Sequence, residues 1–228
     1  MTRARASDPR RRVQDTGTAA VVFDLDGTLI DSFGLIAASF RHAARVVLDR
    51  SLTEDEVMAR WGEPLAVRAA SLGAGRADEL VVAYTAYYDA NHDRLCRLFA
   101  GVPEMLTALA ARGVRMGVAT SKRRRSTMQA LDGCGLWRWV GAAVSAEDVQ
   151  HPKPAADPVL EALRLLGAAP AGAWMVGDGV FDVEAARRAG VRSVAALWGT
   201  REREALLGAR PDYVAPRPDD MVSLVASG

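Results

Sequence analysis

Short apolar runs alternate with longer amphipathic stretches along most of the chain. Each apolar run is followed by a turn and a helix-like segment, and the runs occupy residues 19–24, 114–120, 140–145, 173–177, 192–196 and 213–215. Strands that are apolar on both faces are typical of a parallel sheet covered by helices on both sides. The pattern therefore predicts an α/β fold built on a doubly wound parallel sheet.

Residues 31–100 interrupt this alternation and contain no evident strand. They predict helices near 32–49, 53–61, 64–72 and 77–98, and apolar residues such as Phe33, Ile36 and Phe40 recur every three to four positions. Thr53 and Glu56 have the spacing of a capping box at the start of the second helix. We predict an α-helical cap over 31–100, inserted into a core domain formed by 19–30 and 101–228.

Composition and charge exclude several classes of protein. Half of the 228 residues are hydrophobic and a quarter are charged, as in soluble globular proteins. No apolar run approaches the roughly eighteen residues of a membrane span, and a net charge of +1 argues against a nucleic-acid-binding domain.

Residues 1–18 carry five Arg and two Asp, and we predict a disordered basic leader without the apolar stretch of a secretory signal.

The cysteines and lysines indicate the redox environment of the protein and the positions where a positive charge is needed. Cys96 and Cys134 are far apart in the sequence and outside any CxxC motif, which predicts buried thiols in a cytoplasmic protein. The 29 basic residues include only two lysines, Lys122 and Lys153, and both follow predicted strands. A compact ammonium group differs from a guanidinium group, so we expect both positions to need a point charge. The run 123–125 is all Arg and is expected on a solvated helix face.

The segment Asp24-Leu25-Asp26-Gly27-Thr28 ends the first predicted strand. Residues i and i+2 of an extended chain point the same way, so Asp24 and Asp26 present two carboxylates where α/β sheets bind ligands. Gly27 permits a tight turn and brings backbone N–H groups close to an anion. An Asx-type turn that merely closes the strand is the alternative interpretation.

Two further motifs follow predicted strands. Asp178 and Asp182 are four residues apart and share a face at a helix start. Four carboxylates at two strand ends repel one another unless a cation binds, and hard oxygen ligands favour Mg²⁺. Thr120 and Ser121 supply hydroxyl and N–H groups suited to phosphate oxygens. Capping of the next helix explains the same residues equally well.

In this order, these motifs resemble those of the haloacid dehalogenase superfamily of phosphatases. The resemblance rests on DxDGT, a strand-ending Thr, the Lys-Pro loop at Lys153 and GDxxxD, and it covers essentially the whole chain after the leader. The predicted helical insertion matches the cap that this superfamily places between its first and second motifs. Segments 61–65, 91–93 and 147–154 are similar to the phosphoglycolate phosphatase group and its pyrophosphatase branch.

The resemblance implies a Mg²⁺-dependent phosphoric monoester hydrolase that acts on a small phosphorylated metabolite, such as phosphoglycolate or pyrophosphate. Asp24 would be the nucleophile that forms an aspartyl-phosphate, and Asp26 would act as acid and base. The Mg²⁺ ligands would be Asp24, the main-chain oxygen of Asp26, Asp178 and, directly or through its support, Asp182. The groups near the phosphate would be Gly27, Thr120, Ser121 and Lys153. From the cap, we expect Glu63 and Arg68 to reach the substrate.

Several alternatives can be compared at this stage. Within the superfamily, Asp26 favours phosphoryl transfer over dehalogenation, and the lack of lysine in 31–100 excludes phosphonate cleavage through a cap Schiff base. A phosphotransferase similar to β-phosphoglucomutase shares the aspartyl-phosphate step and stays open. A phospho-accepting receiver domain belongs to a different class, but it would be nearer half this length and lack the helical insertion.

Overall fold

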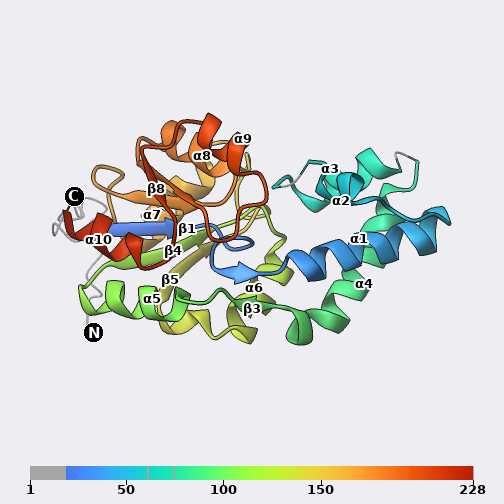
Figure 1. The fold of residues 1–228 in the computed structure, drawn as a ribbon, viewed down its shortest axis with the longest axis horizontal. Coiled ribbons are helices and arrows are strands. Elements are labelled where there is room, and N and C mark those ends of the chain that lie inside the picture. Colours follow the sequence, from blue (N-terminus) through green and yellow to red (C-terminus); the bar gives the residue numbers. More distant parts are fainter. Residues whose placement is uncertain (1–18, 61, 74, 228) are drawn as a thin grey trace, which may run out of the picture.

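The computed structural model describes residues 19–60, 62–73 and 75–227, so the predicted leader at 1–18 lies outside the described residues. Figure 1 shows a sheet flanked by helices and, beside one end of it, a second group of helices. Across the described ranges, no helix combines the length and the apolar run needed to cross a lipid bilayer. The architecture is α/β, as predicted.

Six parallel strands form the main sheet in the order β5-β4-β1-β6-β7-β8. They are β1 (Ala20–Phe23), β4 (Arg115–Ala119), β5 (Val140–Val144), β6 (Trp174–Gly177), β7 (Arg192–Ala196) and β8 (Tyr213–Ala215). Each lies within one predicted apolar run, which confirms the predicted sheet. The strand order reverses at β1, so the carboxyl ends of β1, β4 and β6 meet where α/β sheets bind ligands.

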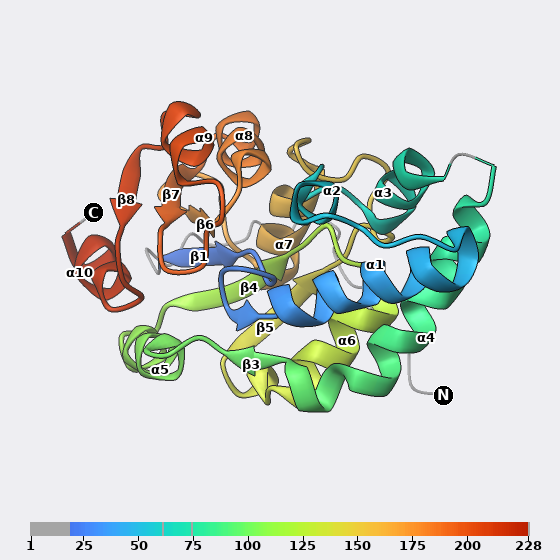
Figure 2. The same cartoon turned by 45° about the vertical axis from the view of Figure 1, so that its right-hand side comes forward.

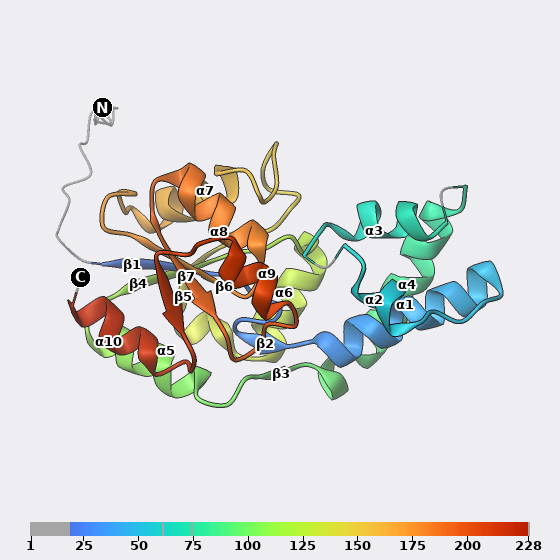
Figure 3. The same cartoon turned by 45° about the horizontal axis from the view of Figure 1, so that its top comes forward.

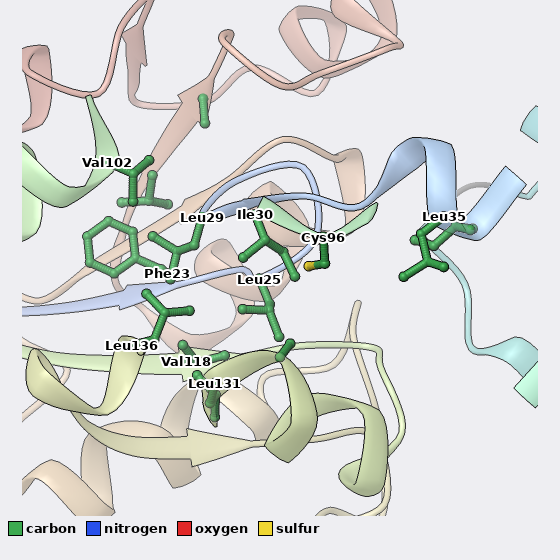
Figure 4. Packing of buried hydrophobic residues seen from close by; sticks show 14 of the residues in the cluster. Phe23, Leu25, Leu29, Ile30, Leu35, Cys96, Val102, Val118, Leu131 and Leu136 are labelled. Carbon is green, nitrogen blue, oxygen red and sulfur yellow. The ribbon is translucent and has the colours of Figure 1, made fainter. Parts of the chain in front are cut away.

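Helices cover both faces of this sheet. The helices on one face are α5 (Val102–Ala111), α6 (Arg124–Gly133) and α10 (Asp220–Ser227), and those on the other are α7 (Asp157–Leu166) and α8 (Val180–Ala189). Alternate residues of β1 point to opposite faces of the sheet. Phe23 packs into the hydrophobic cluster under α5, α6 and α10, and Val22 packs into the cluster under α7 and α8. Figure 4 shows Phe23 packed among buried side chains of the first face. Two short helices complete this part, η1 (Leu136–Arg138) and α9 (Arg203–Gly208).

The second group of helices is inserted between β1 and β4, and we call it the cap. It consists of α1 (Phe33–Leu48), α2 (Glu54–Met58), α3 (Leu65–Leu72) and α4 (Ala77–Leu95), which confirms the four predicted helices. Figure 2 shows α1 and α4 side by side, and the rings of Phe40 and Tyr84 lie 4.7 Å apart between them. The capping box is present at Thr53, whose Oγ1 accepts a hydrogen bond from the backbone N–H of Glu56 at 3.2 Å.

A small antiparallel ribbon joins the cap to the sheet. Its strands are β2 (Ile30–Asp31) and β3 (Arg97–Leu98), and Figure 3 shows both between the two groups of elements. The predicted absence of strands from 31–100 is therefore wrong, and the last helix ends at Leu95 instead of residue 98. Cys96 already has extended backbone angles. Two-residue strands are too short to show the alternation by which strands are recognised.

Candidate active site

The carboxyl ends of β1, β4 and β6 open into a cavity of about 310 Å³ that the cap lines from the other side. All predicted site residues except Gly27 line it, namely Asp24, Asp26, Glu63, Arg68, Thr120, Ser121, Lys153, Asp178 and Asp182. Parallel strands direct their carboxyl ends to one edge, which is why loops distant in sequence meet here.

Asp24, Asp178, Asp182 and Lys153 form one buried group, which we call the core-edge cluster. None of the four is more than 8% exposed. The Nζ of Lys153 donates hydrogen bonds to Oδ1 of Asp24 and Oδ1 of Asp182, both at 2.6 Å. Oδ1 of Asp178 accepts a hydrogen bond from Thr28 Oγ1 at 3.2 Å. When they are ionised, three carboxylates share one ammonium group.

The pKa values within the core-edge cluster reflect this imbalance. Burial raises the pKa of Asp24 to about 7 against the opposing attraction of Lys153, and the charge of Asp182 adds to the rise. Burial also raises the pKa of Asp178 well above its ordinary value, helped by repulsion from Asp24 and Asp182. For Lys153, burial lowers the pKa, but attraction by Asp182 and Asp24 outweighs it and raises the pKa. The cluster therefore favours additional positive charge.

A divalent cation fits this cluster. Single carboxylate oxygens of Asp24, Asp178 and Asp182 lie within 4.8 Å of one another, and all three residues are buried. Carboxylate oxygens are the hard ligands that Mg²⁺ takes in proteins. One divalent ion would offset the two negative charges that remain after the pairing with Lys153. The carboxylate of Asp26 is not part of this group. This agrees with the prediction in one respect, since the prediction assigns the main-chain oxygen of Asp26, and not its side chain, to the metal.

Two glycines make room for the carboxylates. A Cβ on Gly177 would lie 2.1 Å from Cγ of Asp182, and one on Gly27 would lie 2.2 Å from Oδ2 of Asp178. Gly27 also has a φ of 81°, where other residues are strained. The backbone N–H of Gly27 donates a hydrogen bond to the carbonyl of Ile30 at 2.9 Å. This N–H therefore closes the turn, whereas the sequence motif predicts that Gly27 lies near the phosphate. The sequence pattern does not reveal the need for Gly177.

Asp26 belongs to a second group, which we call the cap-facing cluster and which also contains Lys122, Ser32 and Tyr88. The Nζ of Lys122 donates to both carboxylate oxygens of Asp26, at 2.8 and 2.9 Å, and Ser32 Oγ donates to Oδ1. The same Nζ lies 4.6 Å from the ring centroid of Tyr88 on α4, in a cation–π contact. Burial lowers the pKa of Lys122, but the charge and hydrogen bond of Asp26, together with Tyr88 and Tyr84, outweigh burial and raise the pKa.

Thr120 and Ser121 lie in the loop after β4. Oγ1 of Thr120 accepts a hydrogen bond from the backbone N–H of Lys122 at 3.2 Å, which orders this loop. The N-cap of α6 is Arg123, so the capping interpretation of Thr120 is wrong. The Oγ of Ser121 is buried and has no hydrogen-bond partner among the described residues. A buried hydroxyl of this kind in a cavity is available to an oxygen of a ligand.

Glu63 and Arg68 line the cavity, and each is held by partners within the cap. Glu63 Oε2 accepts a hydrogen bond from Arg60 Nε at 2.6 Å. Arg68 Nη2 donates to the carbonyl of Val57 at 2.5 Å, and its guanidinium lies 4.2 Å from the ring centroid of Phe40. Burial lowers the pKa of Arg68 to about 10. This wall of the cavity is therefore fixed by contacts within the cap.

Arg124 and Arg125 are exposed, as expected of a solvated helix face, whereas Arg123 is partly buried at the N-cap of α6; each of the three has an acidic partner. The three ion pairs are Arg123–Glu147, Arg124–Asp148 and Arg125–Asp89. The last of these crosses from α6 to α4, so the run also fastens the cap to the core.

The chain is similar to known proteins over most of its length. The family model described as haloacid dehalogenase-like hydrolase matches residues 21–196. Pyrophosphatase PpaX of Bacillus velezensis is 33% identical over 210 residues, which cover 92% of this chain and 97% of that protein. Pyrophosphatase PpaX of Anoxybacillus flavithermus is 31% identical, with coverages of 90% and 95%. The crystal structure of a predicted phosphoglycolate phosphatase from Haemophilus somnus has the same fold, with a TM-score of 0.84, 24% identity and coverages of 92% and 98%.

Proposed function

The chain belongs to the haloacid dehalogenase-like hydrolases, and on that basis we propose that it is a Mg²⁺-dependent phosphatase that acts through an aspartyl-phosphate on a small phosphorylated metabolite. The observation that carries this proposal is the buried carboxylate of Asp24, held by Lys153 at 2.6 Å beside Asp178 and Asp182. Gathering buried carboxylates costs stability, and such groups are characteristic of functional sites.

Asp24 and Asp26 would divide the chemistry between them. Oδ of Asp24 attacks the phosphorus atom, the bond from phosphorus to the leaving oxygen breaks, and Asp26, protonated for this step, donates its proton to that oxygen and becomes a carboxylate. Asp26 then accepts a proton from the water that hydrolyses the aspartyl-phosphate. Both side chains line one cavity. The hydrogen bonds from Lys122 and Ser32 hold the carboxylate of Asp26 in one orientation.

The phosphoryl oxygens would be held by the unpaired hydroxyl of Ser121, by the loop that Thr120 orders, and by the ammonium group of Lys153. Asp24, Asp178, Asp182 and the main-chain oxygen of Asp26 would hold Mg²⁺. When bound, this ion supplies positive charge that reduces the repulsion between Asp24 and an anionic substrate.

Pyrophosphate is the substrate that we propose first, and phosphoglycolate is the second. Two proteins at 31 and 33% identity carry the name pyrophosphatase. The cavity is also lined by Arg60 and Arg123, which lie outside the core-edge cluster. These cationic side chains suit a substrate with a second anionic group, whether a phosphate or a carboxylate.

A substrate panel tests the proposal. The purified protein is assayed for phosphate release from pyrophosphate, phosphoglycolate and glucose 1-phosphate, with Mg²⁺ and with a chelator. We expect Mg²⁺-dependent release that is fastest from pyrophosphate or phosphoglycolate. Transfer of phosphate within a sugar phosphate would point to a mutase, and one stable phosphoryl group per chain without release would point to a receiver. Either result, or no reaction with any compound, would overturn the proposal.

A further inference from the structure

Two thiols meet where the cap joins the core. Cys96 and Cys134 are 38 positions apart in the sequence, yet their Sγ atoms lie 3.9 Å apart. Cys96 caps the C-terminus of α4 and Cys134 caps the C-terminus of α6. Figure 4 shows Cys96 among the buried side chains, near Ile30 of the joining ribbon. The sequence spacing, which predicts two separate thiols, does not show this contact.

The two cysteines lie at one end of a longer interface between α4 and α6. Nη1 of Arg123 donates to Thr85 Oγ1 at 3.5 Å, and Nε2 of Gln129 donates to the carbonyl of Asp89 at 3.4 Å. Arg125 forms an ion pair with Asp89 at 2.9 Å. These contacts are polar and partly or largely exposed, so each contributes little to holding the cap. A covalent bond at the cysteines would fasten the same interface far more firmly.

We propose that hydrogen peroxide converts Cys96 and Cys134 into a reversible disulfide that fastens cap helix α4 to core helix α6. Nothing in the proposed phosphatase mechanism uses either cysteine, so this modification site is independent of that mechanism.

The chemistry of this step balances with the peroxide as oxidant. The Cys134 thiolate attacks one peroxide oxygen, the O–O bond breaks, and a sulfenic acid and one water are formed. Sγ of Cys96 then attacks Sγ of Cys134, the S–S bond forms, and the sulfenic oxygen leaves as a second water. Two thiols lose two electrons and two protons in total, and the peroxide is reduced to two waters.

The surroundings of the pair suit these two roles. Cys134 is partly exposed and Cys96 is buried, so a small oxidant reaches Cys134 first and Cys96 resolves it. A hydrogen bond from Cys96 lowers the pKa of Cys134, with a further contribution from Arg97, which favours the attacking thiolate. The same hydrogen bond, together with burial, raises the pKa of Cys96. To form a bond of about 2 Å, the sulfur atoms must approach by rotation of side chains that lie at helix ends.

Peptide mapping after peroxide treatment tests the proposal. The chain contains two cysteines only, so an intramolecular cross-linked peptide can join only Cys96 to Cys134. We expect treatment with hydrogen peroxide to yield this peptide, to remove both free thiols, and to raise the Tm by about 5 to 10 °C. Dithiothreitol should restore the thiols and the original Tm. Both readouts are independent of catalysis, so a failed substrate assay would not affect them.

The matched controls are Cys96→Ser and Cys134→Ser. Each removes one sulfur and leaves a similar volume, so peroxide should form no intramolecular cross-link and give no rise in Tm. This comparison also subtracts the effect of methionine oxidation. The proposal would be overturned by sulfinic or sulfonic acid at Cys134 without a cross-link, by a disulfide between two chains, or by a cross-linked protein whose Tm does not rise.

Discussion

The core-edge cluster and the cap-facing cluster share a cavity, and each pairs a buried lysine with aspartate, but their charge balance differs. Lys153 donates hydrogen bonds to two of the three buried carboxylates, so the core-edge cluster has an excess of negative charge when all three are ionised. Lys122 pairs with Asp26 alone and is covered by the ring of Tyr88, so the cap-facing cluster is already neutral. The imbalance indicates where a cation binds, and the neutral pair indicates where a side chain is held in position.

The largest expected effects come from removing one carboxylate of each cluster. Asp24→Asn removes the nucleophile, and we expect phosphate release to fall by a factor on the order of 10⁴ or more. Asp26→Asn removes proton transfer only, so a loss of about 10²- to 10⁴-fold is expected. Steady-state kinetics with saturating Mg²⁺ measure both variants, and circular dichroism checks their folding. Full Mg²⁺-dependent activity in Asp24→Asn would contradict the assignment.

Replacing each lysine should separate the clusters further. Lys153→Met leaves buried carboxylates without their shared partner, so the metal-free protein should lose about 3 to 5 kcal/mol of unfolding free energy. Its activity should fall by about 10²- to 10³-fold. Lys122→Met unpairs one carboxylate that is 18% exposed, so about 1 to 3 kcal/mol is expected, with activity reduced about tenfold. Equal losses in denaturant unfolding of the two variants would show that the clusters do not differ in this way.

The raised pKa of Asp24 gives the metal-free protein a distinctive pH dependence. Its folded pKa is about 7 and its ordinary value is 3.8, so between these values the folded state binds more protons than the unfolded state. The contribution of Asp24 to stability is therefore present below about pH 4 and is lost as pH rises through 7. In thermal unfolding with a chelator, Asp24→Asn should gain Tm relative to the parent protein as pH rises from 5 to 8. Mg²⁺ should raise the Tm of the parent protein more at pH 8 than at pH 5, and the absence of both effects would refute this account.

The smallest expected effect is at the cap wall. Glu63→Gln weakens the ion pair with Arg60 at the cavity, so the ratio of kcat/KM for pyrophosphate and phosphoglycolate should change by about 3- to 10-fold, while the Mg²⁺ requirement stays the same. Glu161→Gln is the matched control, because Glu161 pairs with Arg164 at the same spacing outside this cavity. An equal loss on every substrate would argue against a role of Glu63 in specificity.

The same contrast explains how much could be predicted from the sequence. The six strands and the core-edge carboxylates follow from local pattern, because a parallel sheet brings its carboxyl ends to one edge. The contact of Lys122 with the ring of Tyr88, the contact of Cys96 with Cys134, and the ribbon formed by β2 and β3 depend on how the cap packs on the core. No local period in the sequence records that packing. The need for Gly177 likewise arises from the position of Asp182, which only the folded chain shows.

Trapping the phosphorylated enzyme tests the central claim most directly. The protein is mixed with substrate and Mg²⁺, quenched rapidly in acid, digested, and examined by mass spectrometry. If Asp24 is the nucleophile, the peptide that contains residues 24–28 carries one phosphoryl group on Asp24, and the group is absent from Asp24→Asn. Accumulation should be greater in Asp26→Asn if that variant slows hydrolysis of the intermediate more than its formation. A phosphoryl group on another residue, or rapid turnover with none on the enzyme at any quench time, would contradict the account.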